Sequence, residues 1–148
     1  MVDWFEGEGE ENLWKDEAVP YGEKMPREEF IAQMRKRTKA AAVSIINFME
    51  DTPPCHYSSP LSVIRRQIIR SATSVGANYR AACVARSGRE FFAKLSIVVE
   101  EADETVYWLE LLYDSKIDID RKAIVALGKE WRELTKIVSA ARKSYRNR

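Results

Sequence analysis

Apolar residues recur every three or four positions in four successive stretches of the chain, and this spacing places them on one face of an α-helix. No stretch alternates apolar and polar residues as a half-buried β-strand would. In the last stretch the intervals alternate between three and four without a miss: Ile124, Leu127, Trp131, Leu134, Val138, Ala141 and Tyr145. The pattern predicts an all-α fold of four amphipathic helices.

Residues that begin or end helices separate the four stretches. Pro53 and Pro54 prevent the first helix from continuing, and Ser87 with Glu90 three residues later fits a capping box at the start of the third. The other predicted starts are Pro26, Ser59 with Pro60, and Asp118 or Asp120. Short connections between long helices favour an antiparallel up-down-up-down four-helix bundle.

The first 26 residues differ from the rest in charge and in pattern. Residues 1–26 hold eight acids and two bases and show no apolar period, which predicts a flexible acidic arm. Residues 27–148 hold fifteen acids and twenty-two bases, and we expect them to form one four-helix domain. The net charge of +1 for the whole chain therefore hides an acidic arm joined to a basic body.

Two features bear on where the protein resides. Cys55 and Cys83 give no disulfide framework, and an acidic N-terminus does not match a secretory signal. Charges such as Glu100 and Glu101 interrupt the apolar runs well short of the roughly 20 residues that span a bilayer. We expect a cytoplasmic protein without a membrane segment.

The second predicted helix combines basic residues with a centre of small ones. Its stretch from Ile64 to Ser87 contains no acid and five arginines: Arg65, Arg66, Arg70, Arg80 and Arg86. The first helix adds four more bases, which are Arg35, Lys36, Arg37 and Lys39. These cations can bind the phosphates of RNA or DNA, and the alternative is that they pair with the acidic third helix. Both interpretations stay open from the sequence.

The centre of the same helix is poor in side-chain bulk. A glycine in a helix interior costs about 1 kcal/mol relative to alanine, so Gly76 indicates that a neighbouring backbone approaches closely. Elsewhere, apolar residues at adjacent positions, such as Phe91 with Phe92 and Leu111 with Leu112, make the apolar faces wider than a monomer requires. We therefore expect a homo-oligomer held partly by the third and fourth helices.

The residues needed for familiar chemistry are sparse. A di-iron bundle needs Glu-x-x-His motifs on two helices, whereas His56 in the proline-rich loop is the single histidine of the chain. Neither Cys83 nor the hydroxyl groups of the second helix have a histidine on a helix to serve as base. Glycine-rich phosphate loops are absent as well. We predict no enzyme, no cofactor and no metal.

The stretch from Ser71 to Leu112 resembles the four-helix-bundle family of ribosomal-RNA intervening-sequence proteins. The resemblance is strongest in three places, which are Ser74–Arg80, Ala85–Ser87 with Glu90–Phe91, and Glu101–Thr105 followed by Tyr107–Glu110. Weaker similarity extends over about residues 30–142, and the acidic arm lies outside it. Many relatives carry a glutamate where this chain has Ala81, so any role of that carboxylate does not transfer.

The resemblance implies an antiparallel bundle that assembles into a ring, commonly a pentamer. The family is also similar to the accessory variability determinant of diversity-generating retroelements, a basic ring-shaped bundle that binds nucleic acid and works with a reverse transcriptase. In such a bundle Asn78 is expected to make a hydrogen bond to a neighbouring helix. The residues we assign to packing or assembly are Gly76, Asn78, Tyr79, Trp108 and Trp131.

Two functions remain from the sequence. The first is a noncatalytic, oligomeric nucleic-acid-binding accessory protein that works with a reverse transcriptase. The second is a structural hub that binds only protein and docks through the apolar residues of its arm, which are Trp4, Phe5, Leu13 and Trp14.

Overall fold

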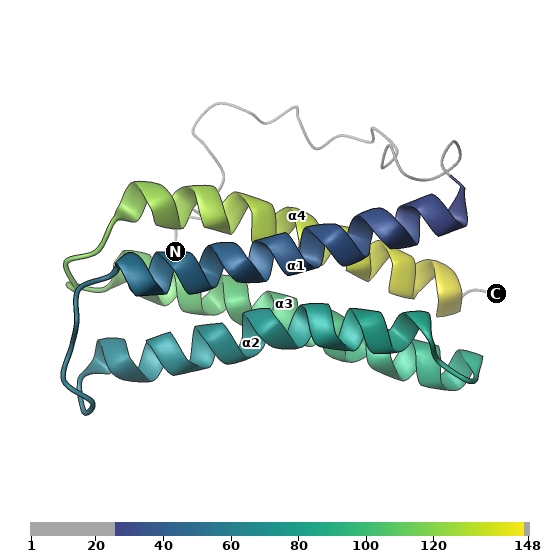
Figure 1. The fold of residues 1–148 in the computed structure, drawn as a ribbon, viewed down its shortest axis with the longest axis horizontal. Coiled ribbons are helices and arrows are strands. Elements are labelled where there is room, and N and C mark those ends of the chain that lie inside the picture. The colour runs from purple at the N-terminus through teal and green to yellow at the C-terminus, as the bar shows by residue number, and fades with distance from the viewer. Residues whose placement is uncertain (1–25, 147–148) are drawn as a thin grey trace.

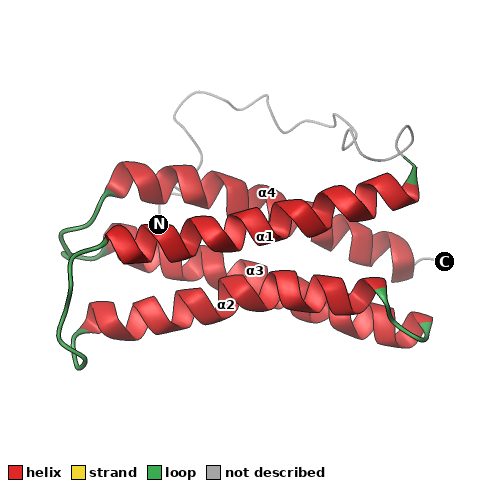
Figure 2. Ribbon diagram, in the orientation of Figure 1, coloured by secondary structure: helices red, strands yellow, loops and turns green. Residues whose placement is uncertain are grey.

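The structure is a computed structural model that describes residues 26–146. It contains four helices, which are α1 (Arg27–Asp51), α2 (Pro60–Cys83), α3 (Gly88–Asp114) and α4 (Arg121–Arg146). Between residues 26 and 146 there is no strand, as Figure 2 shows, so the predicted all-α fold is confirmed. The predicted acidic arm lies outside the described residues, apart from Pro26.

The four helices form one elongated bundle in which consecutive helices run in opposite directions (Figure 1). Each helix packs against two others: α1 contacts α2 and α4, and α3 contacts α2 and α4. This arrangement puts the start of α1, the end of α2, the start of α3 and the end of α4 at the same end of the bundle (Figure 1).

Polar side chains begin the helices close to where the sequence predicts. The Ser59 side chain accepts a hydrogen bond from the backbone N–H three residues later at 3.2 Å, and Pro60 is the first residue of α2. The choice left open at the start of α4 falls on Asp120, whose carboxylate accepts from the N–H of Ala123 at 3.0 Å. Pro26 lies one position before α1 rather than at its first position.

The predicted capping box at the start of α3 forms only in part. Ser87 Oγ accepts a hydrogen bond from the Glu90 N–H at 3.1 Å, as the motif requires. The Glu90 carboxylate, however, accepts from the N–H of Arg86 at 2.9 Å instead of from Ser87. The hydrogen bonds that the Glu90 carboxylate accepts from the backbone N–H and the side chain of Arg86 hold the pKa of Glu90 below its ordinary value.

All four helices contribute to one apolar core. Trp131 is fully buried in it, as expected for the regular stripe of α4. The fully buried large side chains include Ile45 and Met49 from α1, Ile68 from α2, Leu95, Leu109 and Leu112 from α3, and Ile124 and Leu134 from α4. Three other members of the α4 stripe, Leu127, Ala141 and Tyr145, are only partly buried. The core therefore follows the helical period read from the sequence.

Gly76 lies where α1 passes over α2, as the small residues of α2 indicate. A Cβ placed on Gly76 would lie 3.8 Å from Thr38 Oγ1 and 3.9 Å from the Lys39 nitrogen. These are ordinary van der Waals distances, so there is room for a methyl group but not for a larger side chain.

We expect opposite effects from two substitutions at Gly76. Gly76→Ala should stabilise the protein by up to about 1 kcal/mol, because alanine is the better helix former and its methyl group fits. Gly76→Leu should destabilise it by about 1–3 kcal/mol, because the larger side chain forces α1 away. Urea unfolding of both variants measures the difference. Destabilisation by alanine would contradict the spacing between α1 and α2.

Candidate nucleic-acid interface

Arg65 and Arg66 lie in the first two turns of α2, at the end of the bundle away from Gly88, and have partners of their own. Arg65 donates to the backbone oxygens of Thr52 and Pro53 at 3.3 and 3.1 Å, and so satisfies carbonyl groups at the end of α1. Arg66 donates to Ser62 Oγ at 2.6 Å, and its guanidinium lies 4.6 Å from the centre of the Tyr57 ring. These contacts connect α2 to the α1–α2 loop.

Arg70 pairs with the acidic face of α3. Its guanidinium donates to both oxygens of Glu101, at 3.2 and 3.3 Å, and to Glu104. The hydrogen bond from Arg70 is the main reason why the pKa of Glu104 lies below its ordinary value. Trp108 Nε1 also donates to Glu104, at 3.0 Å. Of the two interpretations left open by the sequence, Arg70 therefore fits pairing with the acidic third helix rather than phosphate binding.

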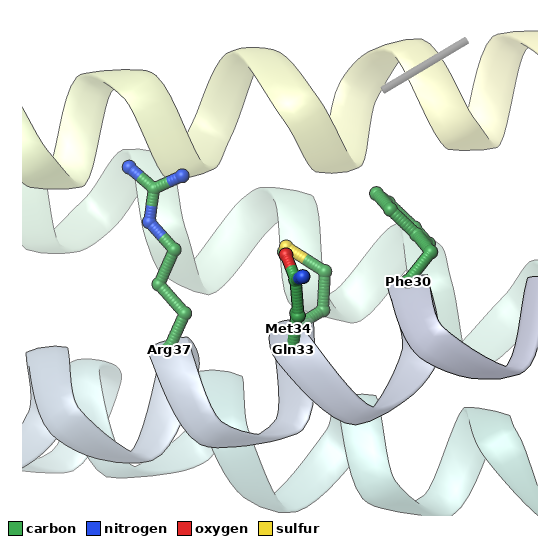
Figure 3. A pocket seen from close by; sticks show the side chains of 4 residues that line it. All are labelled: Phe30, Gln33, Met34 and Arg37. Carbon is green, nitrogen blue, oxygen red and sulfur yellow. The ribbon is translucent and has the colours of Figure 1, made fainter. Parts of the chain in front are cut away.

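Arg37 spans the contact between α1 and α4. Figure 3 shows Arg37 and Phe30 projecting from α1 toward α4. The Arg37 guanidinium lies 2.7 Å from Glu130 Oε1 and 2.8 Å from Glu133 Oε2, and these carboxylates raise its pKa. A cavity of about 20 Å³, room for a single water, lies beside it. Arg37 therefore holds two helices together.

Four of the nine predicted cations have no hydrogen bond or ion pair within residues 26–146: Arg35, Lys36, Lys39 and Arg80. The remaining member of the set, Arg86, lies 3.3 Å from Glu90, although its side chain is 90% exposed. We call the four unpaired residues the α1–α2 basic face. They are all exposed, and the short side chains of Ala40, Thr73 and Ala77 are exposed on the same two helices.

Contacts between α1 and α2 place these cations near one another. The backbone nitrogen of Lys39 lies 3.9 Å from the position that a Gly76 Cβ would occupy. Met34, next to Arg35 in α1, lines the same pocket as Tyr79 and Cys83, so Arg35 lies near the last turns of α2, where Arg80 is found. Exposed cations separated by small side chains allow a phosphate backbone to approach the helices closely.

The fold also collects charge at one end of the bundle. We call residues 27–39, 72–100 and 134–146 the basic half, because these segments meet around the start of α1 (Figure 1). The basic half holds thirteen Lys and Arg residues and four acids, whereas residues 40–71 and 101–133 hold eight bases and eleven acids. All four residues of the α1–α2 basic face lie within the basic half, whereas Arg65, Arg66 and Arg70 lie outside it. Among the described residues, the net positive charge is therefore concentrated at this end.

The residues assigned to packing behave differently from one another. Tyr79 is buried, and burial raises its pKa, as does its hydrogen bond with Cys83. Asn78 does not bond to a neighbouring helix as predicted, because its Nδ2 donates to the oxygen and to the Oγ of Ser74, both at 3.0 Å, one turn back in α2. The polar contact between helices is made instead by Ser71 and Thr105.

Ser71 Oγ and Thr105 Oγ1 lie 2.8 Å apart, and both residues are completely buried between α2 and α3. The sequence signal for this pair is weak, because a small polar residue on an apolar face is equally consistent with simple close packing. Each hydroxyl also lies within hydrogen-bonding distance of a carbonyl of its own helix, Ser71 of Ile68 at 3.2 Å and Thr105 of Glu101 at 2.9 Å. Because each hydroxyl has one proton, one of the two donates to its carbonyl and the other donates across the helices.

This pair predicts a non-additive effect on stability. Thr105→Val removes one hydroxyl and leaves the other without its cross-helix partner, so we expect the free energy of unfolding to fall by about 1–3 kcal/mol. The double change Ser71→Ala with Thr105→Val should cost less than the sum of the single changes. Denaturant unfolding of the four proteins measures this coupling, and additive effects would contradict it.

The part of the chain that the structure describes contains no cluster of three His, Cys, Asp or Glu residues that could hold a metal ion. None of its helices is both long and apolar enough to cross a bilayer. Of the six large exposed apolar side chains among residues 26–146, three lie on α1 and α2, two in the connections on either side of α2, and one on α3, whereas the sequence placed the subunit contact on the third and fourth helices. They are Val43, Ile46, Tyr57, Val63, Val84 and Tyr107.

Comparison with known proteins agrees with this fold. The family model described as 23S rRNA-intervening sequence protein matches residues 32–140. A crystal structure of a protein of unknown function from the S23 ribosomal protein family of Bacteroides thetaiotaomicron is 32% identical, with a TM-score of 0.64. That match covers 76% of this chain and 97% of the other. No curated protein sequence matches the chain. With the family model matched over most of the bundle, the chain belongs to the 23S rRNA-intervening sequence protein family.

Proposed function

We propose that the protein is a noncatalytic nucleic-acid-binding protein whose contact surface is the basic half of the bundle. The observation that carries this proposal is the excess of thirteen bases over four acids at one end. Within that excess, the α1–α2 basic face keeps four exposed cations without partners among residues 26–146. Lys and Arg that neutralise phosphates release condensed counterions, so such a surface binds RNA or DNA without requiring a particular sequence.

The proposal includes an accessory role beside a reverse transcriptase, as the similarity to the accessory variability determinant implies. A noncatalytic role fits a chain whose one histidine, His56, lies in the exposed α1–α2 loop. In this role the protein holds an RNA or DNA strand by its backbone while the polymerase carries out the chemistry. Backbone contacts position a nucleic acid without reading its bases.

We also propose that the protein acts as a homo-oligomeric ring, with five subunits as the family resemblance implies. Val43 and Ile46 of α1 and Val63 of α2 are 43%, 40% and 45% exposed, and a partner subunit would cover them. A ring repeats the basic half once per subunit. Several weak phosphate contacts on one strand then add up to strong binding through the high effective concentration of the remaining sites.

Light-scattering chromatography of the purified full chain, with the ratio of absorbance at two ultraviolet wavelengths, tests the proposal in one experiment. We expect a mass of several subunits and co-purified nucleic acid that dissociates in high salt. Absence of nucleic acid, together with failure of added RNA and DNA to bind at low salt, would overturn the proposal. That result would favour the hub that binds only protein.

A further inference from the structure

A pocket of about 420 Å³ opens at the basic end of the bundle, and all four helices line it. Its walls include Phe30 and Met34 of α1, Phe91 and Leu95 of α3, and Ile137 and Val138 of α4. Pockets that take drug-sized groups have volumes of roughly 300–1,000 Å³ and mostly apolar walls. The pocket is therefore large enough for one or two big side chains.

Apart from Arg27 in the lining, the polar groups of this pocket are hydroxyl and thiol groups, which are uncharged at neutral pH. Tyr79 and Cys83 contribute to the lining, and burial raises the pKa of both. Because the lining offers an apolar surface with neutral donors and acceptors, it suits an aromatic or aliphatic side chain and not an ion.

Cations surround the pocket. Arg27 lies in its lining, and Arg35 is close enough for its charge to act on Tyr79 and Cys83. The wider surroundings are the basic half, with thirteen bases and four acids. An occupant that fits both features carries an apolar anchor flanked by carboxylates.

An apolar anchor flanked by carboxylates occurs in the sequence shortly before α1, whose first residues line the pocket. Leu13 and Trp14 are an apolar pair, and the acids around them are Glu10, Glu11, Asp16 and Glu17. The described chain begins at Pro26, next to Arg27 of the pocket lining. The twelve residues from Trp14 to Pro26 span up to about 40 Å when extended, which exceeds what is needed to turn back into the pocket.

We infer that the pocket is the docking site for the protein's own segment of residues 10–17, with Trp14 as the anchor. A tethered segment meets the pocket at a high effective concentration, so docking does not require strong intrinsic affinity. Trp4 and Phe5 form a similar motif on a longer tether, and for that reason they compete less well.

Docking has a consequence that rests on the proposed function. The carboxylates of residues 10–17 would lie over the basic half, where they compete with the phosphates of RNA or DNA. The docking itself does not depend on nucleic-acid binding.

The test uses the full chain labelled with 5-fluorotryptophan and freed of nucleic acid by nuclease and high salt. Fluorine NMR gives one resonance for each of the four tryptophans, and single Trp→Phe substitutions assign them. We expect the Trp14 resonance to be several-fold less sensitive to a soluble paramagnetic quencher than that of Trp4, which serves as the matched control. Equal sensitivity of Trp14 and Trp4 would overturn the docking, whether or not the protein binds nucleic acid.

Two further measurements locate the contact. Ala141→Leu adds bulk to the pocket at a half-buried position, and it should restore the exposure of Trp14 while the helical circular dichroism stays unchanged. If this variant fails to fold, Trp14→Ala and Trp4→Ala replace it, and only the former should lower the unfolding midpoint. If Trp14 becomes sensitive to the quencher on dilution, the pocket binds residues 10–17 of another copy of the chain. That result would overturn docking within one chain.

Discussion

Removal of three cations from the α1–α2 basic face should weaken nucleic-acid binding. At roughly 0.05 M salt we expect the affinity to fall about tenfold for each phosphate contact that is lost. The reason is that each contact contributes about −0.9 to the slope of log affinity against log salt on duplex DNA. The variant is Lys36→Ala, Lys39→Ala, Arg80→Ala. If each residue makes one contact, the slope becomes shallower by about 2.7. Fluorescence anisotropy with labelled RNA and DNA over a range of salt concentrations measures both quantities.

A control variant removes the same charge from the other half of the bundle. Lys116, Lys122 and Lys129 are exposed and belong to the segments with eleven acids, so their replacement by alanine should leave affinity and slope nearly unchanged. Equal losses in the two variants would mean that net charge alone attracts the nucleic acid. Unchanged binding by both would contradict the proposed surface.

Charge introduced on the outer face of α1 should dissociate the proposed homo-oligomer. We expect Ile46→Glu with Val43→Glu to reduce the mass to that of one subunit at micromolar concentration, because a glutamate buried at a subunit contact is left unpaired. Both side chains are exposed in the single bundle, so the substitutions should not disturb folding. Light scattering at several concentrations measures the mass.

A matched substitution on α3 separates the two possible contact surfaces. Tyr107 is 50% exposed and represents the third helix, on which the sequence placed the contact. If Tyr107→Glu dissociates the oligomer and the α1 variant does not, the subunits meet through α3. A parent protein that is itself monomeric would contradict both surfaces.

Stability should depend on pH through Glu104. Its pKa is lowered in the folded protein, so its ion pair with Arg70 contributes stability above the ordinary pKa of a glutamate, and that contribution is lost as the pH falls through the lowered value. The effect is modest because Arg70 is half-exposed. Arg70→Gln should reduce the fall in unfolding midpoint between neutral and acidic pH, and an unchanged fall would contradict it.

The sequence predicts local structure well because the signals for it are themselves local. Ser59 lies within three residues of the amide it caps, and the stripe from Ile124 to Tyr145 repeats within one helix. Where the predicted local structure differs from the structure, the difference is also confined to neighbouring residues. Glu90 bonds to the amide of Arg86 rather than to that of Ser87, which shifts one contact by a single residue.

The sequence did not predict which residues pair between helices, because the residues that make these contacts are far apart in the chain. Arg37 and Glu130 are 93 positions apart, and Ser71 and Thr105 are 34 apart. Asn78 shows the same limit, since a polar residue within a helix can bond to its own turn or to a neighbour, and only the packing decides which.

By itself the sequence determined four amphipathic helices, the starts of α2 and α3 and a core of regular apolar stripes, because each depends on residues within a few positions of one another. It also determined the number of cations. Only the tertiary structure decided which of them are available, because Arg37, Arg65 and Arg70 find their partners across helices or in the α1–α2 loop. The antiparallel arrangement brings together cations from segments that are distant in the chain, and the basic half exists only for this reason.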